Sequence, residues 1–377
     1  CGDLICCCWS AAPLGGSRMA VRASRAFGAG LRRRGSGTLR RARTLAAAAG
    51  SGAEEGGEAS AYIQDVLGCA PPPGLSALCR VLRAQGATPV PPTSRAGLHP
   101  LVVPLATLPS GEVTGVYRGA GGTASTPDAL CVVRTAHGGR QLHLSARTPR
   151  ELLRRAFAEA DRAGGGALAG LQSAAGANEA ALYAGGEASS SPRIEVFLTT
   201  KVGKFPDVVE SLARGHLLKG DETAALVTAD WYKGGEQAPP GWSRPHCFYA
   251  QLLQEVGRVD EARDAARAAL SVAPWHTLGA PYGDVLAIAA MPDSVGTGAA
   301  AVRAALAGTQ VTAEGFAVPA DPQGQRTQAE REMEEAAGLL GDVAAGEKGY
   351  GDVVAELADR YDRAGRPDLA RLARGAA

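Results

Sequence analysis

Three stretches in the second half of the chain repeat one pattern, and this repeat limits the possible folds more than any other feature. Each has an apolar helical segment, a turn centred on glycine and an alanine-rich helical segment. They read FPDVVESLARGHLLKGDETAALVTADW (205–231), HCFYAQLLQEVGRVDEARDAARAALSVAP (246–274) and YGDVVAELADRYDRAGRPDLARLARG (350–375). Helical pairs of this kind bury their apolar faces by stacking on one another. The pattern therefore predicts a series of antiparallel helical hairpins.

The middle stretch shows why glycine and alanine occupy these places. Gly257 lies where the first helix must end, and glycine adopts a positive φ without the steric cost that other residues have. Ala262, Ala266 and Ala269 then recur with the spacing of one helix face. Small side chains on that face let the second helix approach Leu253 on the first helix closely. The residues themselves thus predict a tight helical pair.

These positions resemble the tetratricopeptide repeat (TPR) family, whose unit is about 34 residues long. The matching residues are Tyr249, Ala250, Leu253, Gly257, Ala262, Ala266, Ala269 and Pro274 in the middle stretch, Leu212, Ala213, Gly220 and Ala225 in the first, and Leu357, Ala358, Tyr361, Gly365 and Ala370 in the last. The turn glycines are 37 and 108 residues apart, so the array is irregular. The resemblance implies a divergent all-α array of three to five hairpins over residues 201–377. Its weakest helix candidates lie within 275–350.

The same resemblance implies a binding surface. Arrays of this family hold partners in a concave groove lined by the first helix of each hairpin. The corresponding positions here are Asp207, Glu210, Arg214, Arg244, Cys247, Gln251, Glu255, Asp352 and Asp359. They do not reproduce the lysine and asparagine clamp that related domains use on chaperone C-termini, so a chaperone-tail partner is disfavoured. The implied partner is a protein of unknown identity.

Residues 54–200 are predicted to form a small α+β domain. LVVPLATL and VTGVYRG flank one tight turn and ALCVVRT and QLHLSA flank another, which predicts an antiparallel sheet of two hairpins. Pro104 lacks a backbone N–H for the sheet, so its strand should lie at an edge or carry a bulge. TPRE at 148–151 has the form of a capping box with proline at the first helical position, and predicts a helix that covers the sheet. IEVFL at 194–198 is a candidate for one more strand.

The first 53 residues differ from the rest in charge. They hold nine arginines and one acid, and from Met19 onward they are rich in arginine, serine and alanine, as organelle transit peptides are. We interpret residues 19–53 as such a peptide and residues 1–18 as an untranslated or non-native leader. Beyond them only Cys69, Cys79, Cys131 and Cys247 remain, without CxxC spacing, which fits a reducing compartment.

Residues 54–377 carry 30 basic and 37 acidic side chains, a net charge of −7. Nucleic-acid binding depends on releasing counterions to lysine and arginine, so no nucleic-acid partner is expected. No run approaches the roughly 18 apolar residues of a membrane-spanning helix. Contact with a membrane such as the thylakoid would therefore be peripheral.

A second resemblance extends over the whole chain after residue 53. LHPLVVPLATLPSGEVTGVYRG together with KVGKFPDVVESLARGHLLKGDETAALVTADWY is similar to functionally obscure TPR-like plastid proteins of plants and green algae. The resemblance favours the chloroplast, at the stroma or thylakoid surface, although an arginine-rich, acid-free leader also fits the mitochondrion.

The sequence shows no clear motif for catalysis or cofactor binding. GAGGTAS at 119–125 lacks the spacing of a dinucleotide or phosphate loop and is predicted to be a hairpin loop. There is no nucleophile elbow, and the six histidines are dispersed, so no catalytic residue, metal site or cofactor is predicted. Three functions remain. A non-enzymatic interaction scaffold or assembly factor is favoured over an RNA-binding helical-repeat protein and over an enzyme with its site in the sheet domain at 96–200.

Overall fold

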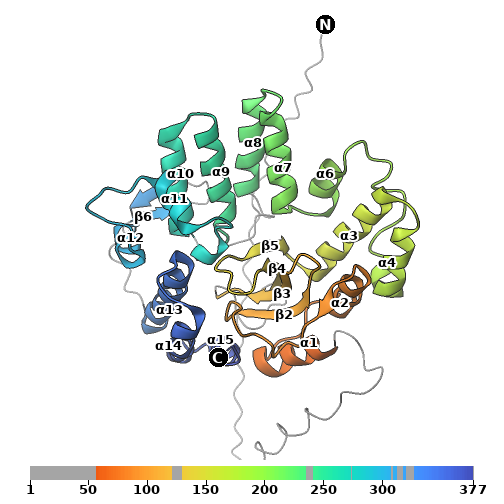
Figure 1. Cartoon of the computed structure of the whole chain (residues 1–377), viewed down its shortest axis with the longest axis horizontal. Coiled ribbons are helices and arrows are strands. Elements are labelled where there is room, and N and C mark those ends of the chain that lie inside the picture. Colours follow the sequence, from red (N-terminus) through yellow and green to blue (C-terminus); the bar gives the residue numbers. More distant parts are fainter. Residues whose placement is uncertain are drawn as a thin grey trace, which may run out of the picture. The chain divides into compact units, whose positions relative to one another are not determined.

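The structure is a computed structural model (Figure 1). It describes residues 57–120, 130–234, 241–272, 274–306, 309–311, 317–319 and 327–376. The described residues belong to one compact unit. The predicted leader and transit peptide lie outside the described residues, as does most of GAGGTAS.

A five-stranded antiparallel sheet forms the centre of the first half. The strands are β1 (Thr88–Pro89), β2 (Val102–Thr107), β3 (Val113–Arg118), β4 (Leu130–Thr135) and β5 (His143–Ala146), hydrogen-bonded in chain order. Pro104 pairs with Gly115 and Ala106 with Thr114, so one extra residue bulges between them. The predicted hairpins and the irregularity at Pro104 are confirmed. Gly115 has no room for a side chain, because a Cβ there would lie 2.6 Å from the carbonyl oxygen of Val103.

Helices cover this sheet before and after it in the chain. They are α1 (Gly57–Tyr62) with a π-helical turn at Ile63–Leu67, α2 (Leu75–Ala84) and α3 (Pro149–Ala163). Helix α4 (Ala167–Ala175) packs on α2 and α3, and α5 (Ala177–Ala180) packs on α4. Helix α3 begins as predicted, because the Thr148 hydroxyl accepts a hydrogen bond from the backbone N–H of Glu151 at 3.1 Å. The Glu151 carboxylate accepts in turn from the N–H of Arg147 at 2.9 Å, one residue further back than in a standard capping box. Leu153 and Phe157 on α3 are fully buried.

The predicted strand at 194–198 is wrong. Helix α6 (Ile194–Phe197) continues into a π-helical turn at Leu198–Val202. The β-branched and aromatic residues suggested a strand, yet Ile194, Phe197 and Leu198 all pack on the main core. Their spacing is that of one helix face, and burial of that face outweighs the local preference for a strand.

The three predicted hairpins are confirmed as pairs of helices. They are α7 (Pro206–Leu217) with α8 (Glu222–Lys233), α9 (Arg244–Glu255) with α10 (Val259–Val272), and α14 (Tyr350–Arg363) with α15 (Pro367–Arg374). The turn residues Gly220, Gly257 and Gly365 have φ of 78°, 79° and 72°. Alanines at the matched positions, such as Ala213 and Ala266, are fully buried. The TPR-like classification of these hairpins stays a prediction.

The segment between the second and third hairpins holds more than helices. It contains a 3-10 turn (Trp275–Thr277), α11 (Tyr282–Ala289), α12 (Ala299–Leu306), a small antiparallel pair of β6 (Thr309–Val311) with β7 (Ala317–Pro319), and α13 (Gln328–Ala345). The three helices lie where weak candidates were expected. The two short strands were not predicted.

The last three helices share the core of the sheet. The largest apolar cluster joins Val103 and Val133 of the sheet to Leu357 of α14 and Leu369 of α15. A second apolar cluster lies among α9 to α12, and a third lies among α7, α8 and α9. In Figure 1 the helices at the end of the chain accordingly lie beside the strands at its beginning. The predicted domain boundary between residues 200 and 201 stays a prediction. The largest apolar cluster contains residues from both sides of this boundary. No helix in the described part of the chain has both the length and the apolar character to cross a membrane.

Candidate functional site

Seven of the nine predicted groove residues lie on α7 and α9, where two ion pairs of opposite direction join the helices. Glu210 of α7 accepts hydrogen bonds from Arg244 of α9 at 2.7 and 2.6 Å. One turn further along α7, Arg214 donates to Glu255, near the other end of α9, at 2.6 and 2.8 Å. We call the surface formed by Asp207, Glu210, Arg214, Arg244, Gln251 and Glu255 the α7–α9 face.

An aromatic ring lies beneath these pairs. The guanidinium carbons of Arg214 and Arg244 are 5.4 and 5.8 Å from the centroid of the Phe248 ring, which is fully buried. Arg244 also donates to the side-chain oxygen of Gln251 at 3.4 Å. Burial alone would lower the pKa of Arg244, but its hydrogen bonds to Glu210 raise it above its usual value. This arginine is therefore charged and held in one position.

The two pairs differ in exposure. The side chains of Arg244 and Glu210 are 19% and 15% exposed, whereas those of Arg214 and Glu255 are 44% and 39% exposed. An exposed pair contributes little stability, about 0–1 kcal/mol, and its charges remain accessible to another molecule. The outer pair is thus the accessible part of the face.

Two more predicted groove residues have other roles. Asp207 forms a two-point contact with Arg155 of α3 at 2.8 and 2.6 Å. Cys247 is fully buried, and burial raises the pKa of its thiol to about 11. The thiol is therefore protonated at neutral pH and does not reach the surface.

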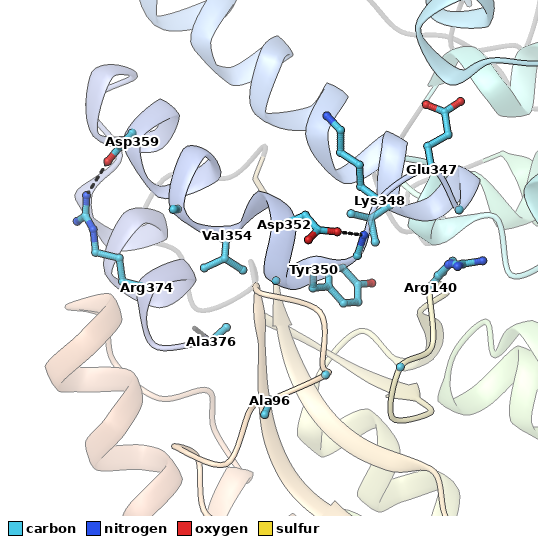
Figure 2. Close-up of a pocket in the computed structure, with 17 residues that line it drawn as sticks. Ala96, Arg140, Glu347, Lys348, Tyr350, Asp352, Val354, Asp359, Arg374 and Ala376 are labelled. Atoms are coloured by element: carbon cyan, nitrogen blue, oxygen red, sulfur yellow. Dashed lines mark hydrogen bonds and ion pairs between the residues drawn. The ribbon is translucent and has the colours of Figure 1, made fainter.

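Asp352 and Asp359 of α14 lie away from the α7–α9 face and line a separate cavity of about 970 Å³ (Figure 2). The cavity lies between the loops of the sheet at Ala96–Gly97 and Gly138–Arg140 and the start of α14. Asp352 accepts a hydrogen bond from the backbone N–H of Gly349 at 2.8 Å and so caps its own helix. The predicted groove is therefore divided between two places.

A buried cluster of rings lies against one wall of this cavity. Tyr350, which lines the cavity, packs edge-on against His99 with 5.4 Å between ring centroids. The rings of His99 and His276 are 4.2 Å apart, and the Tyr117 hydroxyl oxygen lies 2.9 Å from Nε2 of His276. Burial lowers the pKa of His99 and lowers that of His276 to about 3. Both imidazoles are neutral, and the cluster behaves as a polar part of the core.

Sequence reasoning did not find Arg140, Tyr350 or this cluster. The loop at 136–142 and the helix start at 350 carry no motif, and only folding brings them together. Within the ranges that the structure describes, no three His, Cys, Asp or Glu side chains are placed to hold a metal ion.

Three family models match successive parts of the chain. They are described as PAB N-terminal (residues 57–201), PAB middle domain (206–294) and PAB C-terminal domain (310–376). A relative from Arabidopsis thaliana, "Protein IN CHLOROPLAST ATPASE BIOGENESIS, chloroplastic", is 38% identical over 234 residues, which cover 62% of this chain and 68% of the relative. The chain belongs to the PAB family. No solved structure matches it.

The family relationship bears directly on location. The PAB relative is chloroplastic, so the predicted chloroplast location of this protein is confirmed. Whether it lies in the stroma or at the thylakoid surface stays a prediction.

The three PAB models also map onto the structure in a simple way. The N-terminal model covers the sheet and its helices up to the turn after α6, and the middle model covers α7 to α11. The C-terminal model begins in β6 and includes α13 to α15. The α7–α9 face thus lies entirely in the PAB middle domain, whereas the cavity is built from the PAB N-terminal and C-terminal domains.

Proposed function

We propose that this protein is a non-catalytic assembly factor for the chloroplast ATPase and that it works by holding a protein partner. The observation that carries the proposal is the 38% identity to a relative named for chloroplast ATPase biogenesis. At that identity over more than half of both chains, a shared task is the simplest inference.

The α7–α9 face is the surface we assign to the partner. Its inner pair, Glu210 with Arg244, is mostly buried and holds the two helices in register. Its outer pair, Arg214 with Glu255, is accessible and preorganised. A partner with a complementary pair of charges can align on such a surface, which favours correct orientation more than high affinity.

The two alternative functions gain no support from the geometry. An RNA groove needs an excess of positive charge, but both arginines of the α7–α9 face are paired with glutamates, Arg244 with Glu210 and Arg214 with Glu255. An active site in the sheet domain would need an accessible reactive group. Cys131, one candidate there, has a thiol whose pKa burial raises to about 12, so it is not a nucleophile at neutral pH.

Complementation tests the proposal. Arabidopsis plants that lack the relative would express this protein, and the amount of assembled chloroplast ATPase would be measured on native gels. We expect the wild-type chain to restore assembled ATPase. Accumulation of the chain in the chloroplast without any gain in assembled ATPase would contradict the proposal.

Two variants then test the assigned face. Arg214→Glu combined with Gln251→Ala should abolish rescue and partner capture while leaving the melting temperature within a few degrees. Arg263→Glu on α10 is the matched control, because it reverses one half-exposed charge and breaks one exposed ion pair, with Asp260, outside the face. Full rescue by the double variant would remove the α7–α9 face as the binding surface.

A further inference from the structure

A second cavity continues the one in Figure 2 beyond Arg140. The first has a volume of about 970 Å³ and the second about 450 Å³, and Gly138 and Arg140 line both. The second is bounded by Gln141 and His143 and by the segment Gly279–Gly283 that leads into α11. We call the two together the Arg140 trough. It is a two-lobed depression with one arginine at the junction of its lobes.

Arg140 is the feature that distinguishes this trough. Its side chain is exposed, and among the described residues it forms no hydrogen bond or ion pair. Its guanidinium lies close to the end of α13, since a Cβ on Gly346 would lie 2.9 Å from Nη1 of Arg140. A guanidinium placed in this way is available for two-point binding of a carboxylate.

The other cations of the trough are already neutralised. Lys348 donates to Asp342 at 2.9 Å, and Arg374 lies 3.5 Å from Asp359 and also pairs with Asp362. Arg140 is thus the cation of the trough to which a ligand's negative charge would bind.

The walls of the trough favour a peptide over a small polyanion. Glycines 97, 138, 346, 349 and 351 line the first lobe, so no glycine side chain covers the backbone there. The N–H groups of Gly138, Gly346 and Gly349 already donate within the protein. Among the described residues, the carbonyl oxygens of Gly138 and Gly346 accept no backbone hydrogen bond. An extended chain can hydrogen-bond to such groups, as in other modes of peptide recognition. Glu347, Asp352 and Asp359 also line this lobe, and they would repel the several charges of a nucleotide or free phosphate. A single carboxylate with a neutral backbone on either side avoids that repulsion.

We propose that the Arg140 trough binds an extended peptide segment of a partner protein that carries a single aspartate or glutamate, whose carboxylate accepts hydrogen bonds from Arg140. The proposal rests on the proposed function, because it takes the partner to be a protein, and it adds a second contact outside the α7–α9 face. Two separate contacts on one partner strengthen binding through effective concentration.

A peptide array tests this proposal. Overlapping peptides that cover the chloroplast ATPase subunits would be probed with the purified full chain, and each bound peptide would be remade with its acidic residues changed to Gln or Asn. We expect each bound peptide to contain an aspartate or glutamate flanked by uncharged residues, and the amide versions to bind at least about tenfold more weakly. Arg140→Gln should weaken binding of the original peptides by a similar factor and leave the amide versions unchanged.

Controls separate the possible outcomes. Arg331→Gln removes the charge of another exposed arginine, in the first turn of α13 and outside the trough, and should leave peptide binding unchanged. Calorimetric titration with ATP and with inorganic phosphate should show no Arg140-dependent binding. Equal peptide binding by wild type and Arg140→Gln, or Arg140-dependent binding of ATP or phosphate, would overturn the proposal. If the wild-type chain restores the ATPase in plants while the trough fails this test, the proposed function stands and only the trough is excluded.

Discussion

The guanidinium of Arg118, at the end of β3, lies 3.4 Å from the carboxylate of Asp368 in the last helix, 250 residues further along the chain. The two side chains are only 1% and 6% exposed. Arg366 also donates to Asp368, at 3.1 Å, and to the carbonyl oxygen of Ala120 at 2.8 Å. Burial would raise the pKa of Asp368, but the hydrogen bond from Arg366 and the charge of Arg118 lower it. This buried network holds the end of the chain against the sheet.

Asp368→Ala should destabilise the protein strongly. Removing one partner of a buried ion pair leaves the other charge buried without compensation, which typically costs about 3–5 kcal/mol. The free energy of unfolding from urea titrations would show the loss. Asp362→Ala is the control, since Asp362 pairs with Arg374 on the surface at 44% and 49% exposure, and it should cost at most about 1 kcal/mol. Similar losses for both variants would contradict the structural role of Asp368.

A fragment of residues 54–200 should not fold on its own. Its sheet buries Val103 and Val133 in the same cluster as Leu357 and Leu369, so without α14 and α15 one part of the core is exposed to water. Exposing apolar area costs roughly 25 cal/mol per Å², and a typical domain is stable by only about 5–15 kcal/mol. Circular dichroism during a thermal ramp provides the measurement. A sharp, cooperative transition of the fragment would show instead that the division at residue 200 separates independent domains.

Acid should destabilise the protein well above the pH at which its carboxylates titrate. Because the pKa of His276 is about 3 and that of His99 is also lowered, the folded state binds fewer protons than the unfolded state, in which a histidine titrates near 6.5. Their contribution to stability is complete above about pH 6.5 and is lost as the pH falls below it, by up to about 1.4 kcal/mol per pH unit for each histidine. Urea unfolding at pH 7.5 and pH 5 measures this slope.

The variant His276→Gln separates this effect from other titrating groups. It should lower stability at pH 7.5, because the contact with the Tyr117 hydroxyl changes, and it should reduce the loss between pH 7.5 and pH 5. His143 and His246, whose pKa values burial also lowers, the latter to about 4, retain their part of the slope. An unchanged slope in the variant would show that His276 does not resist protonation.

Two glycine substitutions should have opposite effects. Gly115→Ala places a Cβ 2.6 Å from the Val103 carbonyl oxygen and 2.7 Å from a methyl carbon of Val102. The strand pair must then shift, at a cost of about 1–3 kcal/mol. Gly170→Ala on α4 meets nothing within 4 Å and should stabilise the helix by up to about 1 kcal/mol. Melting temperatures of the two variants provide the comparison, and a neutral Gly115→Ala would contradict the close packing at the bulge.

Local patterns in the sequence were sufficient for most of the secondary structure. Helix α3 begins at Thr148 and Pro149, and α9 ends just before Gly257. The apolar runs on either side of residues 108–112 pair as strands. Each of these features depends on a few neighbouring residues. The strand predicted from local composition at 194–198 was wrong. This segment forms a helix, because a helix places its apolar side chains on one face that packs on the core.

Packing between elements that are distant in the sequence decides which residues come into contact. The α7–α9 ion pairs join residues 34 and 41 positions apart, and the repeat pattern placed them on adjacent helices. It could not show that Asp352 and Asp359 lie in a different cavity, nor that Arg140 stands free beside the start of α14. The sequence alone therefore determines most of the helices, strands and turns, because their energies are largely local, but not the structure at 194–198 or the short strands β6 and β7. The two candidate surfaces exist only in the tertiary structure, because the α7–α9 face forms when α7 packs beside α9 and the cavity at Arg140 forms when α13 to α15 pack against the sheet.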